Sequence, residues 1–527
     1  MKNIAGVIFR SLILIAFGIA IGVYLNFNIS GGSGITTGDK LSRAVSLIKS
    51  NYVDTLNVDS LEGATANALL QKLDPHSLYL PPQQARSIND RLEGSFSGIG
   101  LEYTILRDTF TIAQVYPKGP AELAGLAPGD KIIEVDKKKF TGSHLTPDSV
   151  SKALRGEDGS EVLLTIIPAK QKTIKQITVT RGKVELSSLD AAYLAAPGTG
   201  YIKISKFAAT TDKDFRAAFF KLKAKGMQKL ILDLRDNGGG YLTTATELAD
   251  EFLKKDKLIM FTKGAHEERK DYFATDSGVF QEGKLAVLIN EYSASASEIL
   301  AGALQDLDRA VIVGRRSFGK GLVQQQFPFD DGSAINLTVA RYYTPSGRSI
   351  QKSYKEGTET YHNEINERVR KGELISAENN LNDSAFKKSP NYLTTKGKKV
   401  FAGGGIMPDV FVPADTLVST QLLRELNNQQ VFTGFVIDKL QTELTKYSSL
   451  DDFLKKFNIS NDTTENFIVY ASATLKEMDS REILLSKEAI KTQIKANAAW
   501  FKWGYNAYFE ALNNNDPVLK KAVEALN

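Results

Sequence analysis

The stretch NEYSASASEILAGALQDLDRAVIVGRRSFGKGLVQQQ, residues 290–326, decides the fold of this chain. An apolar run at 285–289 leads into a patch of small residues that holds three serines. A helical pattern follows, then a second apolar run at 310–313 and a glycine-flanked lysine at 320. This order of strand, turn, helix and strand is typical of α/β enzymes, which present side chains at the carboxyl edge of a sheet.

Two side chains in this stretch, Ser295 and Lys320, point to nucleophilic chemistry. A serine hydroxyl becomes a useful nucleophile when a neighbouring base removes its proton, and a lysine amine is such a base if it is uncharged. Burial would have to lower the lysine pKa by about three units. The ordinary alternatives are that Ser295 begins an S-x-x-E capping box with Glu298, and that the lysine is solvated. The pattern alone leaves both interpretations open.

The same stretch resembles the carboxyl-terminal processing peptidases, also called tail-specific proteases. That family carries a SASASE-like serine turn followed by an FGKG-x-x-Q lysine turn, and both are present here in order. The resemblance implies that Ser295 is the nucleophile and that Lys320, 25 positions later, is its base. It also implies that Gln324 orients the lysine. One position departs from the family pattern, because Tyr292 stands where glycine or threonine is usual.

The length and composition of the chain allow several domains, since 42% of its 527 residues are hydrophobic. The resemblance implies an α/β and α+β multidomain protein with a crotonase/ClpP-like α/β core and an inserted PDZ-like domain. We expect a signal peptide or membrane anchor at 1–30, a helical region at 31–92, the PDZ-like domain at 93–183, the core at 184–350, a polar insertion at 351–398, a return to the core at 399–415 and a helical domain at 416–527.

Composition excludes several classes of protein. The 66 basic and 61 acidic residues are interspersed and leave a net charge of +5, whereas a nucleic-acid footprint needs a concentrated basic face. The absence of cysteine excludes disulfides, thiol catalysis, cysteine-bound zinc and a lipoprotein anchor. The glycines at 238–240 fit no nucleotide-binding pattern, and His76 has no second ligand at metal spacing. We therefore expect no cofactor and a structural role for His76.

The first 30 residues have the pattern of a targeting segment. Lys2 and Arg10 precede a 15-residue apolar run, and a Gly/Ser linker follows it. The run is at the upper limit for a signal peptide and slightly short for a membrane span, and no A-x-A cleavage site follows. We therefore favour an uncleaved anchor over a cleaved signal peptide. The basic residues before the run place the rest of the chain in the cell envelope, on the periplasmic side of the inner membrane.

The regions that flank the predicted domains differ in composition. Residues 38–92 have the spacing of amphipathic helices, with Asp59 as the cap of the second one, and similar helices in the family help subunits form dimers. Residues 349–398 are polar and charged without periodicity, which predicts a solvated insertion or flexible lid. The aromatic residues at 500–509 are interpreted as core or subunit contacts rather than a ligand cage.

Residues 93–183 resemble a PDZ domain, with Gly98-Ile99-Gly100-Leu101 as the carboxylate-binding loop and GPAELAGLAPGDKIIEVD about twenty residues later. Glycines in such a loop let successive amides converge on a terminal carboxylate, and the next strand pairs with the peptide. The alternative is a β-rich domain without a ligand. Arg155 matches a family segment in which the arginine couples peptide arrival to the active site.

The turn at 233–240, Asp-Leu-Arg-Asp-Asn-Gly-Gly-Gly, matches the family segment that lends a backbone amide to the oxyanion hole. The resemblance favours Gly239 as that donor, with Gly240 as the alternative. The second donor would be the amide of Ala296, which follows the nucleophile at a helix N-terminus, where the helix dipole favours negative charge.

The family resemblance, together with these patterns, implies a serine endopeptidase that binds protein substrates with a free carboxyl terminus and processes or degrades envelope proteins, with an activating adaptor as a further partner. A second interpretation is a noncatalytic envelope scaffold that binds carboxyl termini and keeps an idle dyad. A crotonase-like acyl-transfer enzyme is a third, which the PDZ-like insertion and the lack of a coenzyme motif disfavour.

Overall fold

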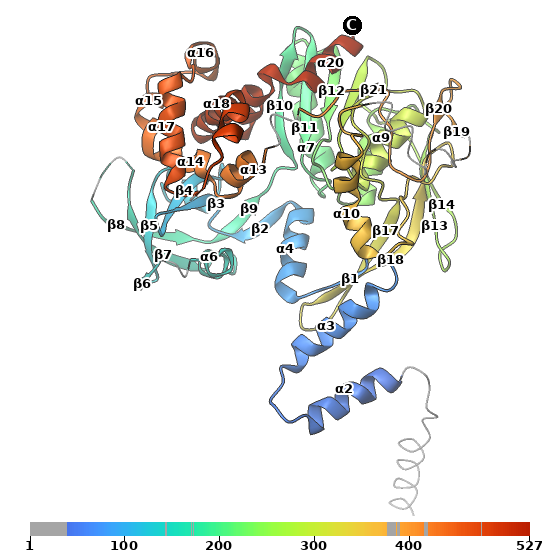
Figure 1. Cartoon of the computed structure of the whole chain (residues 1–527), viewed down its shortest axis with the longest axis horizontal. Helices are drawn as coiled ribbons and strands as arrows, with labels where there is room; N and C mark the ends of the chain where they lie inside the picture. The colour runs from blue at the N-terminus through green and yellow to red at the C-terminus, as the bar shows by residue number, and fades with distance from the viewer. Residues whose placement is uncertain are drawn as a thin grey trace, which may run out of the picture. The chain divides into compact units, whose positions relative to one another are not determined.

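The computed structural model describes residues 39–142, 145–169, 171, 173–376, 386, 390, 392–415, 420–475 and 477–527, and Figure 1 shows their path. The chain divides into two compact units, residues 1–72 and 73–527. The targeting segment predicted at 1–30 lies outside the described residues. In the part of the chain that the structure describes, no helix has the length and apolar character needed to cross a membrane.

The first unit contains the helices α2 (Asp39–Asn51) and α3 (Val58–Leu70), which confirms the predicted helical character of this region. The start of α3 differs from the prediction, because its cap is Asn57 and not Asp59. The Asn57 side chain accepts a hydrogen bond of 3.1 Å from the amide of Ser60. Asp59 lies inside the first turn, where a carboxylate interacts favourably with the helix dipole.

The second unit is built on a six-stranded sheet with the order β10-β11-β12-β15-β16-β21. From β11 to β21 all neighbouring strands are parallel, and β10 runs antiparallel to β11. Parallel strands are covered on both faces, which explains the continuous apolar runs in the sequence. The strands are β10 (Leu189–Ala196), β11 (Thr199–Ile204), β12 (Lys229–Asp233), β15 (Leu285–Ile289), β16 (Val311–Gly314) and β21 (Val410–Phe411).

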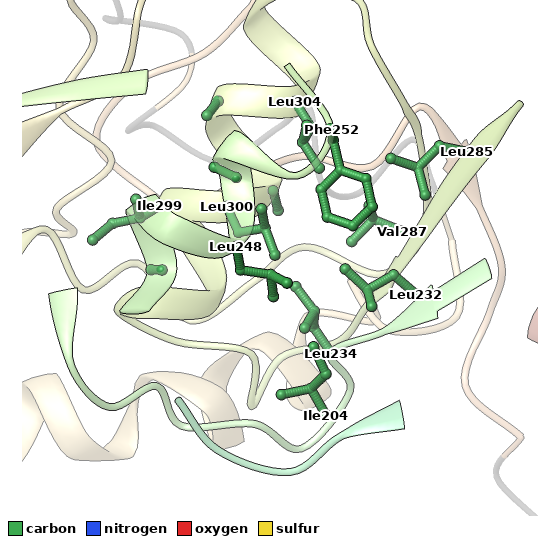
Figure 2. Packing of buried hydrophobic residues seen from close by; sticks show 14 of the residues in the cluster. Ile204, Leu232, Leu234, Leu248, Phe252, Leu285, Val287, Ile299, Leu300 and Leu304 are labelled. Carbon is green, nitrogen blue, oxygen red and sulfur yellow. The ribbon is translucent and has the colours of Figure 1, made fainter. Parts of the chain in front are cut away.

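Helices cover both faces of this sheet. On one face, α7 (Thr211–Ala224), α8 (Leu242–Asp250) and α9 (Ala296–Asp306) enclose a hydrophobic cluster, part of which Figure 2 shows. Every residue of α9 is buried. On the other face, α20 (Pro517–Ala525) packs against the strands. The end of the chain therefore belongs to the core, which corrects the assignment of all residues from 416 to 527 to a separate domain.

A second sheet has the order β1-β18-β13-β14, with β17 also paired to β18. The short strand β1 was not predicted, because three residues give too little alternation to recognise. It pairs antiparallel with β18, with Leu78 opposite Asn336. The strands are β1 (Leu78–Leu80), β13 (Leu258–Lys263), β14 (Lys270–Phe273), β17 (Leu322–Pro328) and β18 (Ala334–Tyr343).

The PDZ-like domain follows the helix α4 (Pro82–Glu93) and forms a sheet with the order β3-β4-β5-β7-β8, with β6 beside β5. At its base, β2 (Ser95–Gly98) pairs with β9 (Gly182–Glu185), so the chain enters and leaves the domain at neighbouring points, as an inserted domain requires. Its other elements are β3 (Leu101–Leu106), β4 (Thr109–Val115), α5 (Pro120–Leu123), β5 (Lys131–Val135), β6 (Lys138–Lys139), α6 (Pro147–Leu154), β7 (Glu161–Ile167) and β8 (Lys175–Thr180).

A cluster of C-terminal helices packs around its own hydrophobic core and contacts the PDZ-like domain. The Gln114 side chain on β4 donates to the carbonyl oxygens of Trp500 and Phe501, at 2.6 and 2.9 Å. Trp503 and Tyr508 pack against the helical core, as predicted. The helices are α13 (Gln421–Asn428), α14 (Val431–Phe435), α15 (Gln441–Leu444), α16 (Leu450–Lys456), α17 (Asn461–Ser472), α18 (Ser480–Trp503) and α19 (Tyr505–Leu512).

The prediction of a solvated insertion at 351–398 is wrong for its first part. Residues 349–376, which include the helix α10 (Thr358–Arg370), are packed into the unit, with Ile350, Tyr361 and Arg368 each 2% exposed or less. The charged side chains that made this region look solvated are instead paired with one another in the interior. The short strands β19 (Tyr392–Leu393) and β20 (Lys399–Val400) complete the segment.

Candidate active site

Three loops meet at the carboxyl edge of the six-stranded sheet. The loop after β12 carries the glycines at 238–240 and is called the glycine turn. The serine turn, with Ser295, follows the neighbouring parallel strand β15, and the lysine turn, with Lys320, follows β16. Backbone hydrogen bonds join them: the Ala294 amide donates to the carbonyl oxygen of Asn237 and the Phe318 amide to that of Ser293, both at 3.0 Å. Residues 57 and 25 positions apart in sequence thus form one site, at the edge where α/β proteins bind their ligands.

The serine turn holds Ser295 in a strained conformation. The residue has φ 55° and ψ −113°, a region that side chains other than glycine rarely adopt, at a cost of about 1–3 kcal/mol. A sharp, strained turn between a strand and a helix exposes a nucleophile above the sheet edge in other hydrolases. Gly239 makes room for it, because a β-carbon at Gly239 would lie 2.9 Å from the β-carbon of Ser295. Strain at this position is therefore a functional signal.

The fully buried carboxylate of Glu298 joins the serine turn to the lysine turn. One of its oxygens accepts the amides of Ser295 and Lys320, at 2.9 and 2.8 Å. The other accepts the Ser317 hydroxyl and the Gly319 amide, at 2.5 and 2.6 Å. The capping box expected from the S-x-x-E pattern is present, but its glutamate does more than cap α9. The sequence indicated the cap and missed the connection.

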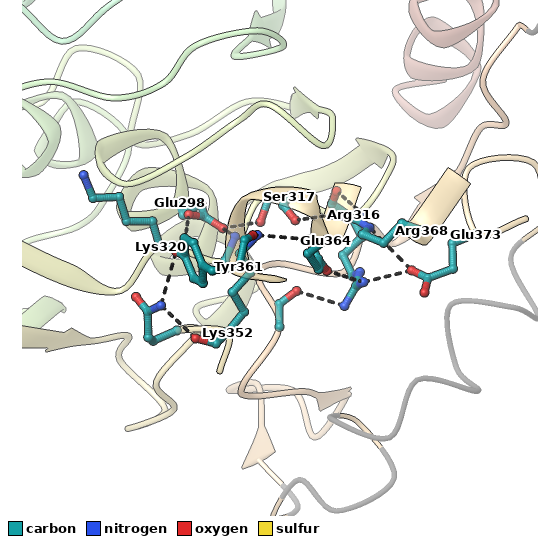
Figure 3. Close-up of polar contacts among 12 residues, drawn as sticks. Glu298, Arg316, Ser317, Lys320, Lys352, Tyr361, Glu364, Arg368 and Glu373 are labelled. Carbon is teal, nitrogen blue, oxygen red and sulfur yellow. Dashed lines mark hydrogen bonds and ion pairs between the residues drawn. The ribbon is translucent and has the colours of Figure 1, made fainter. Parts of the chain in front are cut away.

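The Lys320 side chain has the electrostatic surroundings that a general base needs. Burial lowers the pKa of Lys320 to about 8, while the negative charges of Glu298 and Asp74 oppose that fall. The buried hydroxyl of Tyr342 donates to the carbonyl oxygens of both Lys320 and Ser295, at 2.9 and 3.2 Å. Figure 3 shows the lysine reaching away from the polar contacts beside it. Among the described residues, no hydrogen-bond partner lies at its amine.

The side chain of Gln324 lies on β17 but does not contact the lysine amine. It donates to the hydroxyl of Thr338 on β18, at 3.2 Å, and Thr338 also hydrogen-bonds to Asp74. The role that the family resemblance implied, direct orientation of Lys320, is therefore not the contact that this structure contains. The physical reason is that Gln324 and Thr338 face each other across the β17–β18 pair, so the amide is satisfied within the sheet.

The glycine turn gives one unexpected result. The amide of Gly239, favoured as an oxyanion donor, donates to the side-chain oxygen of Asn237 at 2.8 Å, so it is already occupied. No partner among the described residues takes the amides of Gly240 and Ala296. A β-carbon at Gly239 would lie 3.0 Å from the Ala296 nitrogen, which places the two segments in direct contact. The assignment of two backbone amides as oxyanion donors stays a prediction. The Gly239 amide can fill that role only after it leaves Asn237.

Buried ion pairs fix the lysine turn from the far side, as Figure 3 shows. The Arg368 guanidinium on α10 donates to the carbonyl oxygens of Ser317 and Arg316, at 3.1 and 2.8 Å. Arg316 in turn pairs with Glu373 at 2.8 Å and with Glu364 at 3.2 Å. Sequence reasoning missed this support, because nothing in the charge pattern of α10 distinguishes it from a solvated helix.

Residues 98–101, predicted to form the carboxylate-binding loop, lie where β2 ends and β3 begins. Gly98, Ile99 and Gly100 are buried, and Leu101 begins β3, which is an edge strand of its sheet. The backbone of Arg155 forms an isolated antiparallel β-bridge with Gly98. Its guanidinium group lies 4.6 Å from the centre of the Phe96 ring and forms an ion pair with Asp90 on α4.

The same helix also contacts the glycine turn of the core. Its last residue, Glu93, accepts a 2.8 Å hydrogen bond from the Tyr241 hydroxyl, and Tyr241 follows the three glycines directly. The carbonyl oxygen of Leu92 accepts the Ala209 amide at 2.8 Å. α4 therefore contacts both Arg155, which is paired with Gly98, and the turn beside the serine.

Residues 198–360 of the chain match the model of peptidase family S41, and residues 111–168 match the PDZ domain. Residues 422–504 match a family of unknown function, DUF8443. The carboxy-terminal processing protease CtpB of Bacillus subtilis (strain 168) is 36% identical over 323 residues, which cover 61% of this chain and 67% of that protein.

Two further similarities are weaker. A probable CtpA-like serine protease of Staphylococcus aureus (strain MRSA252) is 33% identical over 335 residues, 62% of this chain and 66% of that protein. Among solved structures, the photosystem II D1 C-terminal processing protease is 29% identical, with a TM-score of 0.32 over 59% of this chain and 89% of that one. The similarity to the two bacterial relatives thus extends over about two thirds of their length.

Proposed function

The chain belongs to peptidase family S41, the carboxy-terminal processing serine proteases, and we propose that it hydrolyses proteins near a free carboxyl terminus through a Ser–Lys dyad. The observation that carries the proposal is the pair of clamps on Ser295 and Lys320. Glu298 accepts both backbone amides, and Tyr342 donates to both carbonyl oxygens. Burial that brings the pKa of Lys320 to about 8 makes its neutral form accessible near neutral pH.

In the proposed reaction, the Ser295 hydroxyl attacks the scissile carbonyl carbon while the Lys320 amine takes its proton. The resulting ammonium returns the proton to the leaving amine, which departs and leaves an acyl-enzyme. A water molecule then attacks the ester while Lys320 takes its proton. The Lys320 ammonium returns this proton to the departing Ser295 oxygen, and the carboxylic acid product is released. The amide of Ala296 at the start of α9 stabilises the oxyanion, a contribution of about 3 kcal/mol. Gly240 supplies the second donor, or Gly239 does after leaving Asn237.

The PDZ-like domain captures the tail of the substrate in this proposal. The terminal carboxylate binds at residues 98–101, and the preceding residues pair with β3, the edge strand of the sheet. Arg155 and α4 then connect that event to the glycine turn, through the Asp90 ion pair at one end of the path and the hydrogen bond between Glu93 and Tyr241 at the other. The effect of this connection would be to free the Gly239 amide from the Asn237 side chain, to which it now donates.

The wider biological setting is part of the same proposal. An N-terminal anchor would place the protease on the periplasmic side of the inner membrane, where it would act on envelope proteins. Homodimer formation and an activating adaptor are further expectations from the family resemblance. The exposed apolar side chains of α2, among them Leu41 and Leu47, are consistent with an interface for a second subunit.

One turnover experiment tests the function. Wild-type protein and Ser295→Ala are incubated with an unfolded protein substrate that carries either a free or an amidated carboxyl terminus. We expect cleavage of the free-ended substrate only by the wild type, with activity reduced about 10⁴-fold or more in Ser295→Ala, because the nucleophile is gone. Equal turnover by Ser295→Ala would remove this serine from the mechanism. Binding of free tails without any turnover by either protein would favour the noncatalytic scaffold.

A further inference from the structure

We propose that the turn Asp74–Ser77 is a working part of the active centre, in which Asp74 supplies a fixed negative charge facing the lysine amine, and His76, with Tyr361, keeps water away from it. The inference rests on the proposed function of Lys320 as a base. It concerns a turn that sequence patterns predict to be structural only. Asp74 and His76 are positioning residues here, since neither touches a reacting atom.

The turn is anchored by sheet pairing rather than by the loops that carry the catalytic side chains. β1 follows it directly and pairs with β18, the strand that also carries Thr338 and Tyr342. The Thr338 amide donates to the Ser77 hydroxyl at 3.1 Å. β17, which starts two residues after Lys320, pairs with the same strand. The turn and the lysine are thus held on opposite sides of β18.

Asp74 is held rigidly and in its charged form. It is 7% exposed and accepts the amides of His76 and Ser77, both at 2.8 Å, and the Ser77 hydroxyl at 2.6 Å. Burial raises the pKa of Asp74, but these bonds and one from Thr338 outweigh that effect and leave the pKa below its ordinary value. Because Gln324 donates to the same Thr338 hydroxyl, the family's glutamine acts on the lysine through Asp74 in this arrangement.

His76 and Tyr361 lie together beside the lysine turn. The Nε2 atom of His76 lies 2.8 Å from the Tyr361 hydroxyl, and their rings meet edge-on at 5.2 Å. The Gln351 side chain then links Tyr361, at 3.4 Å, to the lysine turn, because its oxygen accepts the Gly321 amide at 2.7 Å. The ring of Tyr361 also meets Phe318 at 5.9 Å. These contacts explain why α10 is packed in the interior.

The charges around the amine explain how the turn acts. Glu298 from α9 and Asp74 from the turn are the two negative charges that favour the ammonium form of Lys320. Burial, with Lys320 as the next largest influence, lowers the pKa of His76 to about 3, so the imidazole is neutral at neutral pH. Lys352 and His362, from the segment that carries α10, and the phenols of Tyr342 and Tyr361 complete the titratable groups nearby.

The two halves of the turn therefore have opposite effects on the lysine, and this is the basis of the test. Asp74→Asn removes an attractive charge and should lower the pKa of Lys320 by about half a unit or more. His76→Ala admits water, reduces the desolvation of the amine and should raise that pKa by a similar amount. A role limited to holding the fold would move neither value. Thr338→Val, which loosens Asp74 without removing it, should shift the pKa in the direction of Asp74→Asn by less.

The measurement is the pH dependence with which Lys320 reacts with an amine-specific acylating reagent, read by mass spectrometry of the peptide that contains it. The pH dependence of kcat/KM for the free-ended substrate is recorded in parallel. Thermal unfolding confirms that each variant is folded. Exposed residues provide the controls: Asp330→Asn, at the far end of the β17–β18 hairpin, and His266→Ala should leave both profiles unchanged.

Opposite shifts in the two folded variants support the proposal, and an unshifted Lys320 profile in both overturns it. If Asp74→Asn does not fold, Thr338→Val tests the role of the Asp74 charge instead. A lowered pKa of Lys320 in that variant supports the role, and an unchanged pKa overturns it. The reagent reports on the lysine whether or not the protein cleaves peptides. A wild type that lacks turnover but shows the shifts would contradict the proposed function, while still showing that the turn sets the pKa of Lys320.

Discussion

The serine turn and the lysine turn are held in place by different kinds of interaction. Ser295 is fixed by the chain itself, in a strained conformation between the buried strand β15 and the wholly buried helix α9. The lysine turn is fixed by polar side chains from elsewhere, chiefly Glu298 and Arg368. Apolar packing around a regular element is robust, whereas a buried polar network depends on every partner. The nucleophile should therefore tolerate changes around it better than the base does.

The largest effect should come from changing the base itself. Lys320→Arg keeps a cationic side chain, but a guanidinium cannot act as a base because it stays protonated. We expect kcat/KM to fall about 10³-fold or more, with little change in the thermal unfolding temperature. Lys355→Arg, at an exposed site, is the matched control and should be fully active. Retained activity in Lys320→Arg would mean that another group takes the serine proton.

A smaller effect is expected from Glu298→Gln, which tests whether the two turns are coupled. Each carboxylate oxygen of Glu298 accepts two hydrogen bonds. In the variant, the NH₂ group of the glutamine cannot accept, so two of these four donors would lose their acceptor. We expect kcat/KM to fall about 100-fold, because misplacement of the base relative to the nucleophile is costly. Glu282→Gln, at an exposed site before β15, is the control. Unchanged kinetics in Glu298→Gln would show that the turns are positioned independently.

Glu298 should also make the stability of the wild type depend on pH in a way that the stability of Glu298→Gln does not. Burial raises the pKa of Glu298 from its ordinary value of 4.5 to about 7, against its hydrogen bonds. The folded state therefore holds this proton more tightly than the unfolded state, so the stabilisation is complete below about pH 4.5 and is lost as the pH rises through about 7. Across that window, the wild type should lose up to about 3 kcal/mol of unfolding free energy relative to Glu298→Gln. The unfolding free energies of both proteins are measured by urea unfolding at each pH. A difference between them that stays constant from pH 4.5 to above 7 would contradict this assignment.

The sequence predicted the serine turn better than the lysine turn for the same physical reason. Runs such as 285–289 and the spacing of Ile299, Leu300 and Leu304 predict β15 and α9, and these elements place Ser295. The order of elements in the PDZ-like domain was predictable in the same way. The family signature then identified both Ser295 and Lys320. The fold class is confirmed, while the site roles stay predictions.

The buried polar contacts were not predictable, because they are set by tertiary pairing and leave no periodic pattern. Residues 349–376 have the composition of a solvated segment, yet Arg368 and Glu373 meet in the interior. Asp74 and His76 come from a turn some 245 positions before Lys320 along the chain, and only the pairing of β1 with β18 brings them to it. The Gly239 amide could not be assigned from sequence either, because Asn237 occupies it through a local turn.

The smallest effect on catalysis should come from Arg368→Met, which removes a support of the lysine turn without touching the site. The guanidinium holds two carbonyl oxygens of that turn and pairs with Glu373, so its loss leaves buried acceptors unsatisfied. We expect a loss of about 3 kcal/mol in unfolding free energy. Activity at low temperature should fall about tenfold, since Glu298 still holds the turn. Arg370→Met, which breaks an exposed pair with Glu367 on the same helix, should cost less than about 1 kcal/mol. If Arg368→Met and Arg370→Met unfold alike and are equally active, the buried network does not support the lysine turn, and Glu298 alone accounts for its position.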